Sequence, residues 1–166
     1  MTNKELQQKI EELEKQIDDL KNIKIEGKQK KWKPEWGETY YCVSADCSVG
    51  SYIFANDDFD NGCISVGNCF QTEEEAQFVA DKIKYTQKFK RFIEERSDPI
   101  DWRSEEKKKW YIAYDFEEHH IEIDFDEYFM SQGTIYASSE QILKDAVAYV
   151  GKDNVKKYIL EVENDN

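Results

Sequence analysis

Two segments of the chain are similar in sequence, and this internal similarity constrains the fold more than any other feature of the sequence. GNCFQTEEEA occupies residues 67–76, and GTIYASSEQI occupies residues 133–142, at an offset of 66. In both, a strand-like end is followed by a hydroxyl residue with Glu or Gln three positions later, the pattern of a capping box that begins a helix. The sequence therefore predicts two similar units, each with strands followed by a capped helix. The paired capping residues are Thr72 with Glu75 and Ser138 with Gln141.

The segments around these caps complete the two units, which span residues 37–96 and 107–160. Alternating and β-rich runs predict strands near 39–45, 50–55, 63–70, 109–116, 119–125 and 133–137. Asn61-Gly62 is a hairpin-turn signal, and Gly151 follows a helix predicted at 139–149. A longer helix is predicted at 73–95 and a short one at 154–160, capped by Asp153. This pattern predicts an α+β domain at 37–160 with helices covering antiparallel sheet, either as one continuous sheet or as two stacked halves.

The N-terminal segment has a heptad pattern of apolar residues. Ile at position a and Leu at position d favour a parallel two-stranded coiled coil, so residues 1–25 are predicted to form a dimerisation helix and the chain a homodimer. An amphipathic helix packed on its own domain is the alternative. A Lys-rich linker at 26–36 and a disordered tail at 161–166 complete the predicted organisation. The seam residues are Leu6, Ile10, Leu13, Ile17 and Leu20.

Charge is distributed unevenly along the chain. The net charge is −13, although residues 1–36 hold 9 Lys against 8 acidic side chains. The remaining part is therefore strongly acidic, which repels nucleic acid and attracts basic surfaces. Solubility is the simpler explanation of such a charge.

The acidic residues are most regularly spaced in HHIEIDFDEYF, residues 119–129. Side chains of a strand alternate between its faces, so Ile121, Ile123 and Phe125 are predicted to point one way. Carboxylates are predicted on the other face, where solvent, a metal beside one of the two histidines, or a basic partner would screen their repulsion. The predicted row is Glu118, Glu122, Asp124 and Asp126, with Asp115, Glu117 and Glu127 nearby.

Motifs of catalysis and cofactor binding are not found in the sequence. It has no G-x-S-x-G, H-E-x-x-H, G-x-G-x-x-G or P-loop pattern, so we predict a protein that is not an enzyme and has no cofactor. NDDFDNG at 56–62 lacks the Gly and Glu of a calcium loop and is interpreted as a hairpin loop. The cysteines are spaced too widely for the usual zinc knuckle, although a zinc site remains an alternative. They are Cys42, Cys47, Cys63 and Cys69.

The chain is expected in the cytosol. No apolar run approaches the roughly 18 residues of a membrane span. The N-terminus has no apolar segment typical of a secretory signal.

Several stretches together resemble a group of small phage and prophage proteins of Gram-positive bacteria. They are WKPEWGETYY, GNCFQTEEEAQ, a W-Y-I-x-Y-D strand and a late GTIY with SSEQ, over roughly residues 32–160. The resemblance implies a mobile-element setting and no particular chemistry.

These features together predict an acidic, dimeric, non-enzymatic inhibitor or adaptor that binds a host protein with a basic surface. A nucleic-acid mimic that blocks a defence nuclease, as an anti-CRISPR protein does, is the most specific form of this hypothesis. The alternative is a nucleic-acid-associated accessory protein that contacts phosphate through the linker. Its contacts would be Lys28, Lys30, Lys31 and Lys33.

Overall fold

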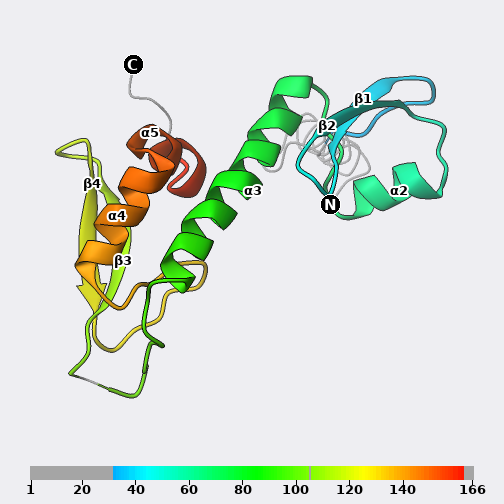
Figure 1. Ribbon diagram of the computed structural model, residues 1–166. Helices are drawn as coiled ribbons and strands as arrows, with labels where there is room; N and C mark the ends of the chain where they lie inside the picture. Colours follow the sequence, from blue (N-terminus) through cyan, green and yellow to red (C-terminus); the bar gives the residue numbers. More distant parts are fainter. Residues whose placement is uncertain (1–31, 105, 163–166) are drawn as a thin grey trace, which may run out of the picture. The chain divides into compact units, whose positions relative to one another are not determined.

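The structure, a computed structural model, describes residues 32–104 and 106–162, and the part from Lys33 onward is one compact unit (Figure 1). The predicted coiled-coil helix 1–25, with its seam and its homodimer, lies outside the described residues, as do residues 26–31 of the predicted linker. Within the described part the chain is α+β, as predicted. Its elements in order are β1 Thr39–Val43, β2 Val49–Ile53, α2 Asp58–Ser65, α3 Glu73–Glu94, β3 Lys109–Asp115, β4 His120–Asp126, α4 Glu140–Val150, α5 Lys152–Asn154 and the π-helix η1 Val155–Ile159.

The strands of the described residues form two separate antiparallel hairpins, β1–β2 and β3–β4. The third strand predicted for each unit is reduced to one bridge: Tyr41 pairs with Phe70, and Trp110 pairs with Ala137. Each bridging residue stands two positions before the N-cap of the following helix, Thr72 or Ser139. The two N-caps are therefore 67 positions apart, one more than the offset of 66 between the two similar sequence segments.

α2 replaces the hairpin turn and strand predicted at 61–70. Asp57 is its N-cap: the Asp57 carboxylate accepts from the backbone N–H of Asp60 at 2.9 Å, and the Asp60 carboxylate accepts from the N–H of Asp57. This capping box nucleates a helix that runs through Asn61 and Gly62. The prediction failed because two Asp residues at cap spacing outweigh the roughly 1 kcal/mol that Gly costs inside a helix.

Asp60 also ties α2 to β1. The hydroxyl of Tyr40, whose side chain is fully buried, donates to Asp60 Oδ1 at 2.6 Å, and the backbone N–H of Ala55 donates to Oδ2 at 2.7 Å. The hydrogen bond from Tyr40 is the largest cause of the lowered pKa of Asp60. Burial, and then this carboxylate, raise the pKa of the Tyr40 hydroxyl. A buried carboxylate with three donors is thus the polar centre of the β1–β2–α2 region.

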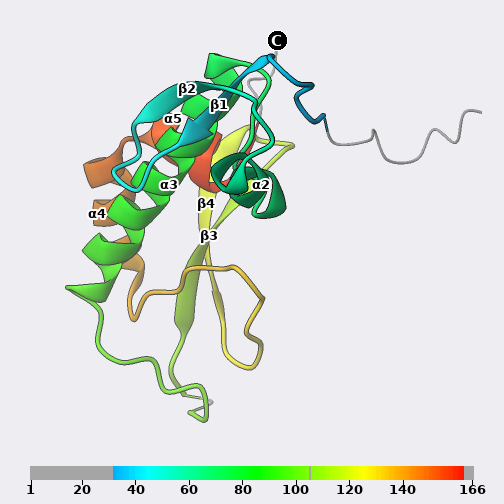
Figure 2. The ribbon, with the colours of Figure 1, turned by 90° about the vertical axis from the view of Figure 1, so that its right-hand side faces the viewer.

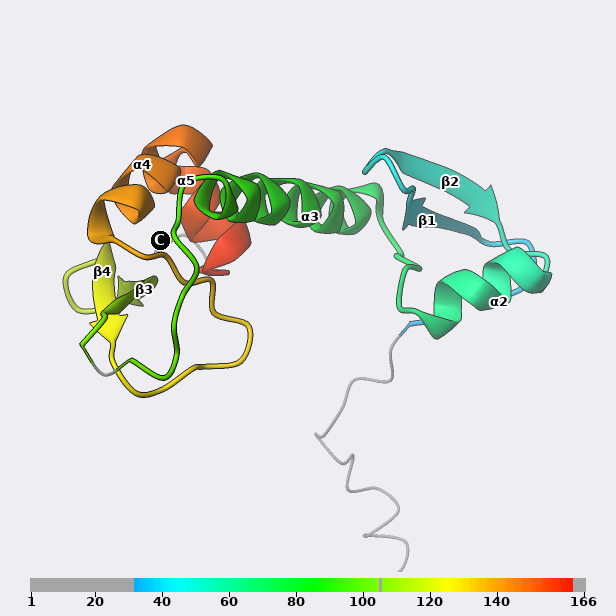
Figure 3. The ribbon, with the colours of Figure 1, turned by 60° about the horizontal axis from the view of Figure 1, so that its bottom comes forward.

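α3 begins at the predicted cap and runs between the two halves of the unit. Thr72 accepts from the N–H of Glu75, whose side chain reaches back to the backbone of Thr72, so the first predicted capping box is confirmed. One end of α3 contacts β1 and β2, and its other part contacts α4 and η1 (Figures 1 and 3). Phe89 and Ile93 of α3 enter the main core, where they meet α4, Ile112 of β3 and Val155 of η1.

α4 begins one residue later than predicted. Its N-cap is Ser139, which accepts from the N–H of Ile142 at 3.4 Å, so the predicted Ser138–Gln141 capping box is wrong. The Ser138 hydroxyl instead accepts from the N–H of Asp98. Gly151 ends α4 with φ of 93°, as predicted, since this backbone conformation favours glycine.

The helical segment after Gly151 differs from the predicted one. α5 and η1 replace the single helix expected at 154–160, and Asp153 lies in the first turn of α5 without capping it. Glu161 forms an ion pair with Lys82 at 2.7 Å, and Val162 is buried. Residues 163–166 of the predicted tail lie outside the described residues.

Candidate functional site

The β3–β4 hairpin has one apolar and one polar face, as the alternation in its sequence predicts. Trp110, Ile112 and Tyr114 pair with Phe125, Ile123 and Ile121 on the face that α4 covers (Figure 3). The polar face pairs Lys109 with Asp126, Tyr111 with Asp124, Ala113 with Glu122, and Asp115 with His120. Figure 2 shows the two strands side by side along their length.

The exposed carboxylates gather toward the turn of this hairpin. Glu122 and Asp124 are exposed on β4, and Glu117 and Glu118 are exposed in the turn between the strands. Glu118 therefore lies outside the strand row in which it was predicted, because the turn occupies residues 116–119 and His119 has a φ of 53°. We name Asp115, Glu117, Glu118, Glu122 and Asp124 the acidic patch.

Backbone hydrogen bonds fix part of the acidic patch. Asp115 Oδ1 accepts from the N–H groups of Glu117 at 2.8 Å and Glu118 at 2.9 Å. These two bonds are the main cause of the lowered pKa of Asp115, so this carboxylate stays ionised at neutral pH. Asp124 Oδ1 accepts from the N–H of Phe125 at 2.7 Å. Two charges of the patch are thus held in set directions by the hairpin itself.

The other end of the polar face is covered. The ammonium of Lys109, which is 1% exposed, donates to the carbonyls of Ser104 at 2.6 Å and Glu127 at 2.7 Å. Tyr136 packs on Tyr111, with ring centroids 5.7 Å apart. Because the adjoining loops close over this end, the predicted row does not run along the whole strand.

The remaining two predicted partner-binding residues lie at this covered end. Asp126 is half-buried, and its Oδ1 accepts from the N–H of Phe129 at 3.1 Å, which orders the following loop. Glu127 is half-buried, and its carbonyl is the Lys109 acceptor named above. The contacts of both residues therefore help to organise this end of the hairpin.

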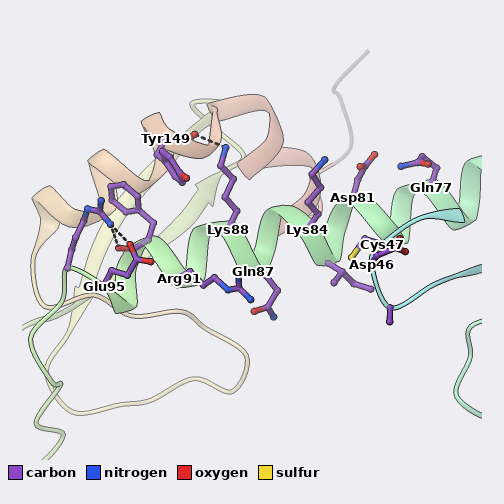
Figure 4. Close-up of a pocket in the computed structure, with 14 residues that line it drawn as sticks. Asp46, Cys47, Gln77, Asp81, Lys84, Gln87, Lys88, Arg91, Glu95 and Tyr149 are labelled. Carbon is purple, nitrogen blue, oxygen red and sulfur yellow. Dashed lines mark hydrogen bonds and ion pairs between the residues drawn. The ribbon is translucent and has the colours of Figure 1, made fainter.

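A second charged surface lies on α3. An open groove of about 730 Å³ is lined by α3, the β1–β2 turn and Tyr149 of α4. Figure 4 shows Lys88 reaching Tyr149, with Gln87 and Arg91 pointing away from it. The Lys88 ammonium donates to the Tyr149 carbonyl at 3.2 Å and lies 4.4 Å from the centre of its ring.

The cationic part of this groove is not among the predicted sites. KIKYTQKFKR, residues 82–91, interleaves basic and aromatic residues, the signal expected of a phosphate-binding strip. The groove also holds three carboxylates, Asp46, Asp81 and Glu95. Its cations are Lys84, Lys88, Arg91 and Arg96.

The cysteines do not form a metal centre in the part of the chain that the structure describes, where no group of three or more His, Cys, Asp or Glu side chains is arranged to hold a metal ion. Cys42 and Cys63 are buried, and Cys47 and Cys69 are half-buried. Burial, followed by the neighbouring Cys63, raises the pKa of the Cys42 thiol to about 11, and burial also raises the pKa of Cys69. Neutral thiols of this kind pack as small apolar groups.

Comparison of the chain with protein-family models, with curated proteins and with solved structures finds no match. Within residues 32–104 and 106–162, no helix has the length and apolarity to cross a membrane.

Proposed function

We propose that this chain is a non-enzymatic inhibitor or adaptor whose acidic patch binds a basic surface of another protein. The observation that carries the proposal is the exposure of Glu122 and Asp124 on β4, beside the carboxylates of the adjoining turn. Like charges held this close repel one another, and a cationic partner surface relieves that repulsion on binding. The acidic patch would also steer the partner during diffusional encounter.

The most specific form of the proposal is mimicry of nucleic acid. Proteins that bind nucleic acid line their surfaces with Lys and Arg for phosphate. Alternate residues of a strand are about 6.6–6.8 Å apart, so Glu122 and Asp124 present a regular pair of negative charges. The hydrogen bonds to Asp115 and Asp124 set charge directions before binding, which lowers the entropy lost on association.

The cellular setting of the proposal rests on the resemblance to phage and prophage proteins. A mobile-element protein of this charge suits a host complex that handles nucleic acid, such as a defence nuclease, in the host cytosol. The predicted coiled coil at 1–25 would present two acidic patches, which raises avidity if both engage at once.

A second candidate function is association with nucleic acid itself. The observation that favours it is the cationic part of the α3 groove, with Lys84 and Arg91 both exposed. The Lys-rich linker adjoins this unit in sequence and would supply further cations for phosphate. A gel-shift series with single-stranded and duplex DNA and RNA tests this function, since phosphate contacts weaken steeply with added salt.

The main proposal is tested with a charge-reversal variant, Glu117→Lys/Glu122→Lys. Both side chains are exposed, so the fold is expected to survive. The control, Glu94→Lys/Asp145→Lys, changes the net charge equally at two exposed helix positions. Proteins captured from a bacterial host lysate by the wild type are identified, purified and titrated against all three forms.

We expect the acidic-patch variant to bind its partner at least about tenfold more weakly, equivalent to 1.4 kcal/mol, at low salt. The control should bind within about twofold of the wild type. Equal binding by the wild type and the acidic-patch variant, at low and physiological salt, would refute the proposal.

A further inference from the structure

The outer edge of β2 is open. β2 pairs with β1 on one side, and in the part of the chain that the structure describes no other strand joins it. Both backbone groups of Tyr41 bond to Phe70, so Tyr41 faces away from β2. Hydrogen bonding alternates along an antiparallel pair, which leaves the N–H and C=O groups of Val49, Ser51 and Ile53 directed toward the open edge.

This edge lacks the protection that the other hairpin has. β4 pairs only with β3 among the described strands, but its sequence HIEIDFD carries three carboxylates, which discourage edge-to-edge pairing. β2 reads VGSYI and has no charged side chain. Ser51 is exposed, and Ile53 is 69% exposed. An uncharged open edge of this kind is a template for another extended strand.

We propose that the β2 edge binds the β2 edge of a second copy of this chain, antiparallel, around a twofold axis at Ser51. In this register Ser51 lies opposite Ser51 of the second copy, and Val49 lies opposite Ile53 of the second copy. The backbone groups of all three outward-facing residues then find partners across the axis. Such an interface is isologous and closes at two copies.

The side chains suit this register. Each exposed Ile53 gains a neighbouring Val49 across the axis, an apolar pair that occurs twice by symmetry. Residues 47–55 contain no charged side chain, so no like charges face each other over this length. Pairing therefore covers exposed apolar surface with no like charges opposed within the paired segment, and the self-complementary register makes a second copy the occupant that pairs every outward-facing backbone group. The residues of this interface are distinct from those of the acidic patch.

The register is tested by cross-linking the full chain. Opposed residues of a hydrogen-bonded antiparallel pair have Cα atoms about 5.5 Å apart, within the range of a disulfide. Mild oxidation of Ser51→Cys should give a disulfide between the two introduced thiols, identified by peptide mass. Thr39→Cys, exposed on β1 away from this edge, should give none.

Sedimentation tests the same interface without a cross-linking reaction. In an Ile10→Asp/Ile17→Asp background, which removes the predicted coiled-coil seam, we expect concentration-dependent dimers. Adding Ser51→Lys places two ammonium groups opposite each other and should weaken self-association at least about tenfold. Ser51→Thr and Ala148→Lys, the latter at an exposed α4 position, should leave it within about twofold.

Three outcomes would overturn the proposal. One is the absence of the disulfide at position 51 in both the native and the Ile10→Asp/Ile17→Asp backgrounds. Another is a cross-linked species whose introduced thiols pair only with native cysteines. The third is a protected β2 edge in a monomeric protein, measured by amide hydrogen exchange, because this would show that a segment of the same chain covers the edge.

Discussion

Removal of the buried carboxylate of Asp60 should be among the most destabilising single changes in this chain. Asp60→Ala deletes the acceptor of the Tyr40 hydroxyl at 2.6 Å and of the Ala55 N–H at 2.7 Å, together with a longer bond from the N–H of Asp57. Hydrogen bonds to a charged group contribute about 1.5–3 kcal/mol each, and a buried donor without a partner costs about 1–3 kcal/mol. We expect the free energy of unfolding to fall by about 4 kcal/mol.

Tyr40→Phe separates the two contributions. It removes the buried donor and leaves Asp60 its backbone partners, so we expect a loss of about 2 kcal/mol. The double variant Tyr40→Phe/Asp60→Ala should lose less than the sum of the single losses, because the unpaired hydroxyl disappears. Urea unfolding followed by circular dichroism measures all three, with an unchanged slope as the sign that only stability has changed.

The pH dependence provides an independent check on the role of Asp60. The folded-state pKa of Asp60 lies below its ordinary value of 3.8, chiefly because of the Tyr40 hydroxyl. The stabilisation is therefore complete above pH 3.8 and is lost as the pH falls through the folded-state pKa. The stability gap between the wild type and Asp60→Ala should narrow only in that acidic range. A loss below about 1 kcal/mol at neutral pH, or additive single losses, would refute the reasoning.

Three further substitutions test individual contacts. Lys109→Met leaves the carbonyls of Ser104 and Glu127 without their buried donor; we expect a loss of about 2 kcal/mol and faster hydrogen exchange in the loops at 97–108 and 127–138. Gly151→Ala forces a φ of 93° on a residue with a Cβ and should cost about 1–3 kcal/mol in thermal or urea unfolding, and a stable variant would show that this turn relaxes freely. Ser139→Ala removes the cap of α4 and should cost about 1 kcal/mol by the same assays, whereas no loss would argue for another cap.

The fold could be predicted from the sequence where local signals agreed. Thr72 and Glu75 stand at capping-box spacing before an amphipathic run, and the helix begins there. α2 has an equally local signal, Asp57 and Asp60, but it competes with the turn signal of Asn61-Gly62. The bond from Tyr40 to Asp60, which joins residues 20 apart in the sequence, reinforces that helix, and no local pattern reveals it.

Prediction from the sequence is also limited where two neighbouring residues are chemically alike. Ser138 and Ser139 are equally good caps by their chemistry, and the choice depends on the loop that brings the N–H of Asp98 to Ser138. The predicted strand at 133–137 fails for a related reason, because only Ala137 reaches a partner strand. Tertiary contacts decide between local alternatives in both cases.

The candidate site was predictable in its alternation but not in its extent. Period-two spacing placed Glu122, Asp124 and Asp126 on one face, as the strand register has them. The burial of Lys109 opposite Asp126 depends on that register and on loops distant in sequence, so the covered end of the row could not be foreseen. The basic run on α3 is visible in the sequence at 82–91, but the Lys-rich linker is a more concentrated signal of the same kind.

Competition with nucleic acid tests the central claim most directly. A partner recovered from the host lysate is first bound to labelled DNA or RNA, and the chain is then titrated in while fluorescence anisotropy is followed. If the acidic patch occupies the surface that binds phosphate, the wild type and Glu94→Lys/Asp145→Lys should release the nucleic acid, and Glu117→Lys/Glu122→Lys should not. A stable ternary complex of partner, nucleic acid and wild-type chain, or equal release by all three forms, would contradict the account.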